Sequence, residues 1–321
     1  KFTVAGSFAT KPVVDLISKS VQETHDHHSL LRHEEAELAT RFRETGVPPA
    51  TKRAIPFQVG STRTFVFESF GNVSTLNVTA TLAASNSRAE AWIDNNTSAI
   101  TTAEDQAQID QFTNSTYPIV TGVFGEPSDV DSDGKVLFLY TELVDQVGDV
   151  AGFYRSKSLF STQDGGDGNV ADMMYIGLDH SDTFFESLLA HEFQHLINYN
   201  QHVRVRNGPS ETAPINEAMS HIAEDLVNQH TQGGNPSNIR TYTSNPSIYS
   251  ILAESAHDSG VRGTAYTFAR SMMESFGDDI PTQLVQPSLS GIANVEDVSG
   301  QTFEQVYETY LARMFLAGSG L

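Results

Sequence analysis

The spacing of apolar residues changes along this 321-residue chain, and that change constrains its fold more than any other feature. Before residue 181, outside helical patterns around 30–42 and from 102 to about 124, apolar residues alternate with polar ones or form short runs between turns, a pattern typical of strands. We expect strands near 64–68, 76–82, 89–93, 136–140 and 173–178. Beyond residue 181 the apolar residues recur at helical spacing. We expect helices near 182–200, 214–229, 263–276 and 303–317.

These patterns predict an α+β fold in three segments. Residues 1–56 form an N-terminal helical and linker segment, with a helix around 30–42. Residues 57–100 form a small antiparallel β unit. Residues 101–321 form the main domain, with a mixed sheet in an upper α/β half that extends to about residue 200 and a mainly helical lower half.

Composition excludes several kinds of function. The chain has no cysteine, which rules out thiolate nucleophiles, iron–sulfur clusters and cysteine zinc sites. Its 19 lysines and arginines against 40 aspartates and glutamates give a formal charge of −21, so nucleic acid is not an expected partner. No apolar run approaches the roughly 20 residues of a membrane span. The low lysine content and abundant Asn, Ser and Thr suit a secreted protein, and we expect an extracellular monomer.

One motif carries chemistry. The longest expected helix contains His191-Glu192-Phe193-Gln194-His195, which is the pattern H-E-x-x-H. Because 3.6 residues make one helical turn, His191 and His195 lie on one face, where both imidazoles can bind a single Zn²⁺. Glu192 lies about 100° round the helix, which suits a general base. The alternative reading is two surface histidines on an amphipathic helix.

A third metal ligand follows 22 residues after His195. Glu217 stands on the helix expected at 214–229, and the loop over 201–213 lets that helix fold back against the first. Two histidines and one glutamate leave a fourth position open, which is typical of a catalytic zinc site. The sequence therefore predicts a zinc site made of His191, His195 and Glu217.

At these residues the chain resembles the gluzincin metallopeptidases, and more narrowly the hyicolysin-like family of secreted bacterial zinc proteases. The likeness rests on residues 191–200, on 216–220 and on 125–136 with the strand that follows, and it spans about 58 to 280. It implies that residues 101–321 form a zinc-dependent catalytic domain of the metzincin or gluzincin type.

The resemblance assigns zinc to the same three ligands and makes Glu192 the general base of peptide hydrolysis by a water that zinc activates. The segment around the third ligand also looks like that of thermolysin, except that His221 stands where the thermolysin pattern has an Asp. The carboxylate that orients a zinc-binding histidine must then come from elsewhere, Glu224 or Asp225 being nearest in sequence, or be absent.

Peptide hydrolysis also needs a donor for the oxyanion. Tyr266 is the first candidate, because it stands on a helix otherwise lined by apolar residues, and His221 and Tyr249 are reserves. A core tyrosine with a satisfied hydroxyl is the alternative for Tyr266. Enzymes of this kind resemble one another in holding the peptide against an edge strand beside the zinc helix, and the strand at 173–178 stands at that place in the chain.

A calcium loop is a weaker candidate. Asp129, Asp131 and Asp133 precede Gly134 as carboxylates do at the start of such a loop, but position twelve is Tyr140, where the loop needs an acidic ligand. Ca²⁺ is therefore a candidate second ion, and a turn of solvated aspartates is the alternative.

Three functions compete. The favoured one is a secreted zinc endopeptidase that acts on peptide or protein substrates. The second is another zinc hydrolase on the same scaffold, such as an aminopeptidase, which needs an acidic pocket for a free amino terminus, supplied by Glu224 or Asp225. The third is a noncatalytic binding module that retains the motif; the intact Glu192 argues against it, because a binding module has no use for a base.

Overall fold

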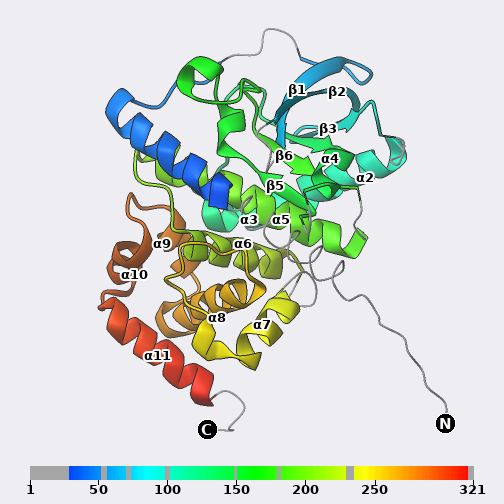
Figure 1. Ribbon diagram of the computed structural model, residues 1–321. Coiled ribbons are helices and arrows are strands. Elements are labelled where there is room, and N and C mark those ends of the chain that lie inside the picture. Colours follow the sequence, from blue (N-terminus) through cyan, green and yellow to red (C-terminus); the bar gives the residue numbers. More distant parts are fainter. Residues whose placement is uncertain are drawn as a thin grey trace, which may run out of the picture.

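The computed structural model describes residues 29–51, 56–69, 74–97, 102–147, 150–178, 182–228 and 235–316. Residues 1–28 of the expected N-terminal segment lie outside these ranges. Figure 1 shows a sheet with its helices in the upper half of the view and a purely helical half below. The strands are β1 (Thr62–Ser69), β2 (Ser74–Ser85), β3 (Ala89–Asp94), β4 (Val136–Tyr140), β5 (Gly152–Tyr154) and β6 (Met173–Ile176).

Helices fill most of the remaining chain. Residues 29–45 form the first described helix. The others are α2 (Thr102–Gln111), α3 (Tyr117–Phe124), α4 (Glu142–Asp145), α5 (Asp182–Tyr199), α6 (Ala213–Asn228), α7 (Asn235–Ser244), α8 (Ser259–Phe276), α9 (Ile280–Val285), α10 (Gly291–Ser299) and α11 (Phe303–Leu316). A π-helical turn, Asn200–Val205, extends α5.

The strands form one mixed sheet in the order β1-β2-β3-β4-β6-β5. β1, β2 and β3 are antiparallel, β3, β4 and β6 run parallel, and β5 returns antiparallel to β6 at the edge. A mixed sheet followed by a helical half confirms the predicted α+β class. The predicted division between residues 57–100 and 101–321 runs through this sheet, since β3 pairs with β4 across it.

β4 shows why the sheet lies in the middle of the upper half. All five of its residues are buried. Leu137 and Leu139 belong to one apolar cluster, and Phe138 and Tyr140 belong to the other. Because successive side chains point to opposite faces of a sheet, a strand covered on both faces reads as a continuous apolar run.

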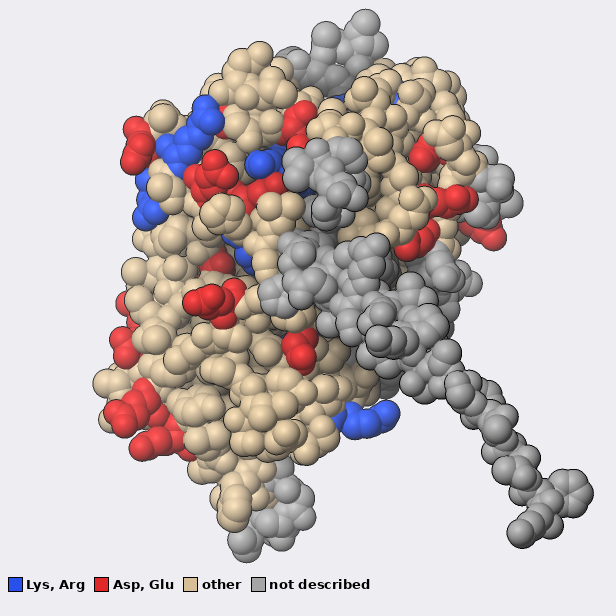
Figure 2. Space-filling model, viewed as in Figure 1, with Lys and Arg blue, Asp and Glu red and all other residues tan. Residues whose placement is uncertain are grey.

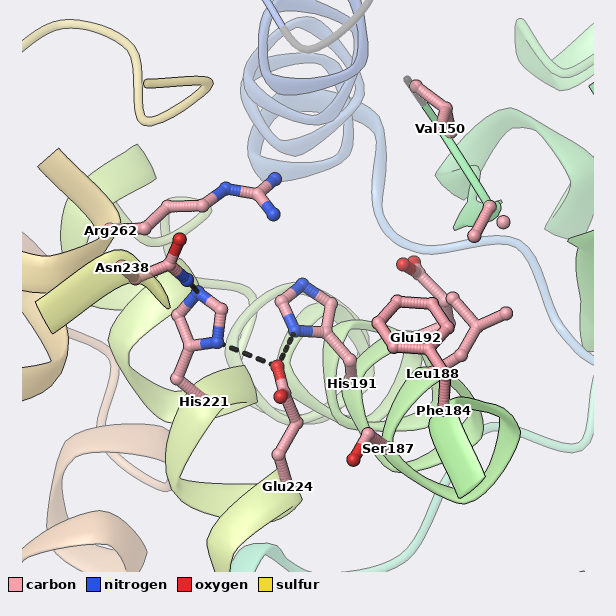
Figure 3. A pocket seen from close by; sticks show the side chains of 12 residues that line it. Val150, Phe184, Ser187, Leu188, His191, Glu192, His221, Glu224, Asn238 and Arg262 are labelled. Atoms are coloured by element: carbon pink, nitrogen blue, oxygen red, sulfur yellow. Dashed lines mark hydrogen bonds and ion pairs between the residues drawn. The ribbon is translucent and has the colours of Figure 1, made fainter. Parts of the chain in front are cut away.

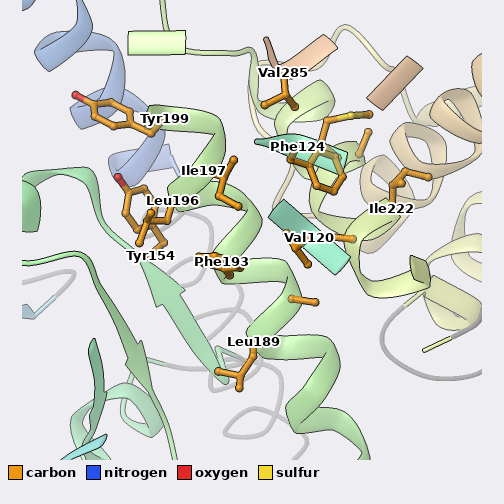
Figure 4. Packing of buried hydrophobic residues seen from close by; sticks show 14 of the residues in the cluster. Val120, Phe124, Tyr154, Leu189, Phe193, Leu196, Ile197, Tyr199, Ile222 and Val285 are labelled. Atoms are coloured by element: carbon orange, nitrogen blue, oxygen red, sulfur yellow. The ribbon is translucent and has the colours of Figure 1, made fainter. Parts of the chain in front are cut away.

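α5 is the central helix of the larger cluster. Nearly all of its described side chains are buried, and Figure 4 shows them packed against α3, α6 and β5. The ring centroid of Phe193 lies 5.0 Å from that of Phe112 and 5.3 Å from that of Tyr117. Truncating such a buried phenylalanine to alanine costs about 3–5 kcal/mol. Packing on all sides makes α5 a rigid support for its polar side chains.

The surface agrees with the acidic composition. On the face shown in Figure 2, acidic side chains are scattered over both halves, and basic ones gather mainly near the helix over residues 29–45. Within the ranges that the structure describes, no helix is long and apolar enough to cross a bilayer.

Candidate metal centre

Two helices place the predicted ligands. His191 and His195 stand on α5, Glu217 stands on α6, and the two helices pack side by side. Ser220 on α6 donates a hydrogen bond of 2.8 Å to the side-chain oxygen of Gln194 on α5, and both side chains are buried. A buried hydrogen bond of this kind fixes how one helix sits against the other, because leaving either group unpaired costs about 1–3 kcal/mol.

The three predicted ligands meet between these helices. Oε2 of Glu217 lies 3.3 Å from Nε2 of His191, and Oε1 lies 3.4 Å from Nε2 of His195. The two imidazole centroids are 4.8 Å apart, and all three side chains are buried. Oε2 of Glu217 also lies 3.3 Å from Nη2 of Arg262, so basic groups surround this buried carboxylate. A buried charge needs such partners, and two imidazoles with one carboxylate are ligands that fit Zn²⁺.

Each histidine has an outer partner that orients its ring. Nδ1 of His191 lies 2.8 Å from Oε1 of Glu224, and Nδ1 of His195 lies 3.0 Å from Oδ1 of Asn216. These contacts leave both Nε2 atoms facing Glu217. Partners of this kind fix the tautomer of a metal-binding histidine and raise its basicity. Of the two carboxylates that the sequence offered for this role, Glu224 takes it.

The histidines differ in their affinity for protons. Burial lowers the pKa of His191, but hydrogen bonds to Glu217 and Glu224 outweigh it and raise the pKa to about 10. Burial lowers the pKa of His195 to about 4, because Glu217 offsets only part of the desolvation. Burial disfavours the charge on Glu217 too, yet Arg262 and His195 hold its pKa well below the ordinary value. Near neutral pH the metal-free site therefore holds one proton, on His191, beside an ionised Glu217.

Glu192 lies next to this group without joining it. Its Oε2 accepts a 2.8 Å hydrogen bond from the backbone N–H of Tyr154, at the end of β5. Burial raises the pKa of Glu192 to about 7, against the opposing effects of His191 and of the Tyr154 N–H. A carboxylate whose pKa lies near the working pH is suited to accept and return a proton.

A cavity of about 170 Å³ opens beside His191 and Glu192. Figure 3 shows its walls: Val150, Phe184 and Leu188 line one side, and polar side chains from α6, α7 and α8 line the other. The acidic members of the lining are Glu192 and Glu224. The cavity therefore joins the candidate base, one candidate metal ligand and an apolar wall.

His221 and Arg262 are basic side chains of the polar wall. Nδ1 of His221 lies 2.6 Å from Oε1 of Glu224, and its Nε2 lies 3.4 Å from Nδ2 of Asn238. One ligand atom each of His191, Glu217 and His221 lies within 4.8 Å of the others, so among the described residues the compact group of possible metal ligands contains His221 and not the predicted ligand His195. Arg262 places Nη2 3.3 Å from Oε2 of Glu217. No motif singled out Arg262, although its position on an otherwise apolar helix face was a readable signal.

The three residues predicted as oxyanion donors differ in where they lie relative to the cavity. Tyr266 does not line the cavity; its hydroxyl donates to Oδ2 of Asp225, as in the alternative of a satisfied core tyrosine. Tyr249 packs its ring against the backbone of Gly260 on α8. His221 is the one of the three that borders the cavity.

The prediction that the strand at 173–178 is an edge strand is wrong. β6, at Met173–Ile176, lies inside the sheet between β4 and β5. β5 is the edge strand next to β6, with β1 at the opposite edge of the sheet, and β5 packs against α5. With three residues it is too short to give a periodic signal, so only the aromatic pair after Gly152 hinted at it.

Asp129 stabilises the turn that the candidate calcium loop forms. Oδ1 of Asp129 accepts the backbone N–H groups of Asp133 and Gly134. Carboxylate oxygens of Asp129, Asp131 and Asp172 lie within 4.8 Å of one another, so the structure groups Asp172, and not Asp133, with the other two. The calcium loop stays a prediction.

Comparisons with known proteins give two kinds of similarity. No protein-family model matches the chain. The neutral metalloprotease ShpI of Staphylococcus hyicus is 33% identical over an alignment of 105 residues, and the match covers 29% of this chain and 23% of that protein. The chain thus matches less than a quarter of the length of this relative.

Two solved structures are loosely similar. One is an M1 zinc metallopeptidase from Deinococcus radiodurans with a bound Tyr-Ser-Ala substrate, with a TM-score of 0.39, 11% identity and coverage of 78% of this chain and 48% of that one. The other is a two-domain M1 zinc metallopeptidase with bound L-tryptophan, with a TM-score of 0.38, 10% identity and coverage of 78% and 47%. A likeness this loose indicates no function.

Proposed function

We propose that this protein is a secreted zinc endopeptidase. The observation that carries the proposal is the meeting of Glu217 with His191 and His195 beside a cavity that Glu192 also lines. Similarity to a neutral metalloprotease supports peptide hydrolysis. Secretion is proposed from composition alone, and calcium has no part in the proposed reaction.

The residues of the site divide the work of hydrolysis. His191, His195 and Glu217 would hold Zn²⁺. When bound, the ion lowers the pKa of a water and polarises a carbonyl group. Glu192 accepts the proton of the attacking water and delivers it to the leaving amine. The Tyr154 N–H holds one carboxylate oxygen of Glu192 and leaves the other for this proton.

His221 is the proposed donor to the oxyanion. Glu224 accepts from Nδ1 of His221, and donation to the oxyanion requires a proton on Nε2, which here faces the amide nitrogen of Asn238 and would have to be released from it. A donor held in place before the reaction stabilises charge that develops during it. Tyr266 is less suited to this role, because its hydroxyl already donates a hydrogen bond to Asp225.

The free edge of β5 is the proposed track for the substrate backbone. In an antiparallel pair, the N–H and C=O groups of successive residues point alternately towards the partner strand and away from it. The Ala151 carbonyl accepts the N–H of Gly177 on the β6 side, so Gly152 directs its N–H and carbonyl, and Tyr154 its carbonyl, to the edge that no described strand covers, while the Tyr154 N–H donates to Glu192. A peptide added there lies along the wall of the cavity beside His191 and Glu192.

The carboxylates near the cavity favour an endopeptidase over an aminopeptidase. Glu224 bonds to His191 and His221. Asp225 bonds to Asn235 and Tyr266 and does not line the cavity. Both residues that would capture a free amino terminus therefore have other partners.

Cleavage of a peptide blocked at both ends tests the proposal. The zinc-loaded protein should cleave it at an internal bond, lose that activity with a chelator and regain it when zinc is returned. Cleavage of free amino termini alone would identify an aminopeptidase. Binding of the peptide without any cleavage would favour the noncatalytic module.

A further inference from the structure

The helix over residues 29–45 is joined to the edge of the sheet by a buried ion pair. Nε and Nη2 of Arg155 donate to the two carboxylate oxygens of Glu34, at 2.8 and 2.6 Å. Arg155 is 1% exposed and Glu34 is 3% exposed. Nη2 of Arg155 also donates to Glu68, and Nζ of Lys157 lies 3.2 Å from Glu34. A two-pronged pair out of water fixes both distance and angle, which a surface pair does not.

Arg155 directly follows the residue that holds the candidate base. Its neighbour Tyr154 ends β5 and donates its backbone N–H to Glu192. β5 has three residues and, in the described part of the chain, pairs with one strand, β6. So short a ladder fixes the strand only in part, and Arg155 is bonded through the backbone to Tyr154, whose N–H holds Glu192.

The same helix is packed firmly enough to serve as an anchor. Leu38, Ala39 and Phe42 are buried in the cluster that also contains Tyr154. The ring centroid of Phe42 lies 4.6 Å from that of Phe160, in the loop after β5. In Figure 4 the hydroxyl of Tyr154 points towards this helix. Both the side chain of Tyr154 and the ion pair beyond it are thus held by one element.

We propose that Glu34 and Arg155 are positioning residues for the general base. They hold the end of β5 so that the Tyr154 N–H meets Glu192 at the cavity wall. This inference rests on the proposed function and adds to it a role for the helix over residues 29–45. Neither residue lines the cavity, and both side chains are buried.

The test compares two variants of the full chain with a matched control. Glu34→Gln keeps the shape of the side chain and removes its charge, and Arg155→Lys keeps the charge and removes the two-pronged geometry. Glu37→Gln changes a carboxylate on the exposed face of the same helix. If Glu34→Gln does not fold, Arg155→Lys carries the same test, because it leaves no buried charge without a partner.

Two readouts are measured on zinc-loaded protein. We expect kcat for a doubly blocked peptide to fall by roughly 10- to 100-fold in both variants, with KM within about twofold of the parent protein. Amide hydrogen exchange over residues 152–156 should become faster, and zinc content should stay unchanged. Glu37→Gln should match the parent in all of these.

The outcomes separate this inference from the proposed function. An unchanged kcat, or unchanged exchange over residues 152–156, overturns the positioning role. A rise in KM with constant kcat overturns it too, because it would place the pair in substrate binding. If the parent protein cleaves no peptide, the proposed function fails, and the exchange measurement alone decides whether the pair holds β5.

Discussion

Oε1 of Glu224 lies 2.8 Å from Nδ1 of His191, so a carboxylate on α6 holds the ring of a metal-ligand candidate on α5. The same oxygen lies 2.6 Å from Nδ1 of His221. Against the effect of burial, Glu217 and Glu224 hold the pKa of His191 high, and the neighbouring histidines hold the pKa of Glu224 at about 2 despite its burial. One glutamate thus supports both a ligand and the proposed oxyanion donor.

Removing this support should weaken zinc binding. Glu224→Gln keeps the volume but loses the charge that orients His191, and we expect zinc affinity to fall by roughly 10- to 100-fold. Competition with a chelator of known affinity measures this. Glu254→Gln, an exposed carboxylate, is the control. Equal affinities in both variants would remove Glu224 from the support of the metal site.

Zinc binding should release about one proton per ion near neutral pH, because the ligand imidazoles must be neutral. His191 is protonated in the metal-free site, with a pKa of about 10, whereas His195, with a pKa of about 4, is already neutral. Affinity should therefore rise with pH until His191 has lost its proton. Calorimetry in buffers of different ionisation enthalpy counts the protons, and a count of zero would contradict the assignment of His191.

Gly152 should not tolerate a side chain. A Cβ at this position would lie 2.9 Å from the carbonyl oxygen of Tyr175 and 3.2 Å from Cδ1 of Leu188, so β5 must move away from α5 or β6. We expect Gly152→Ala to cost about 1–3 kcal/mol in the free energy of unfolding and to lower kcat/KM. Gly122 lies on α3 with open space around it, so Gly122→Ala should be neutral or slightly stabilising. Comparing the thermal unfolding of the two variants therefore separates the effect of the close contacts at Gly152 from the general effect of replacing glycine with alanine.

The oxyanion donor can be assigned by two substitutions. His221→Phe should lower kcat by roughly 10²- to 10³-fold, the usual cost of losing one such donor. Tyr266→Phe removes a hydroxyl group that donates a hydrogen bond to Asp225, so it should affect stability more than kcat. Steady-state kinetics on the same peptide measures both, and the reverse ranking would return the role to Tyr266.

The fold class and the approach of Glu217 to both motif histidines could be read from the sequence, because both follow from the spacing of residues along neighbouring helices. The i, i+4 spacing puts His191 and His195 on one face of α5, and a loop of suitable length returns Glu217 to them. The helices α5, α6, α8 and α11 are long and periodic, and all were predicted. α7 is largely polar and carries little apolar pattern, so it was missed.

What could not be read depends on contacts between distant residues. Glu34 and Arg155 are 121 positions apart, and only the packed structure shows that they pair. β5 is recognisable as the edge strand only when its neighbour β6 is known. Tyr266 looked like a donor because nothing in its own helix revealed Asp225 as its partner.

Turnover by the zinc-loaded Glu192→Gln protein tests the central claim most directly. The substitution keeps the size of the side chain and removes the base, whereas His191, His195 and Glu217 remain in place. We predict about one zinc ion per chain, as in the parent protein, and a kcat lower by roughly 10²- to 10⁴-fold for a doubly blocked peptide. Loss of zinc, or turnover at the parent rate, would contradict the assignment of Glu192 as the general base beside a zinc site of His191, His195 and Glu217.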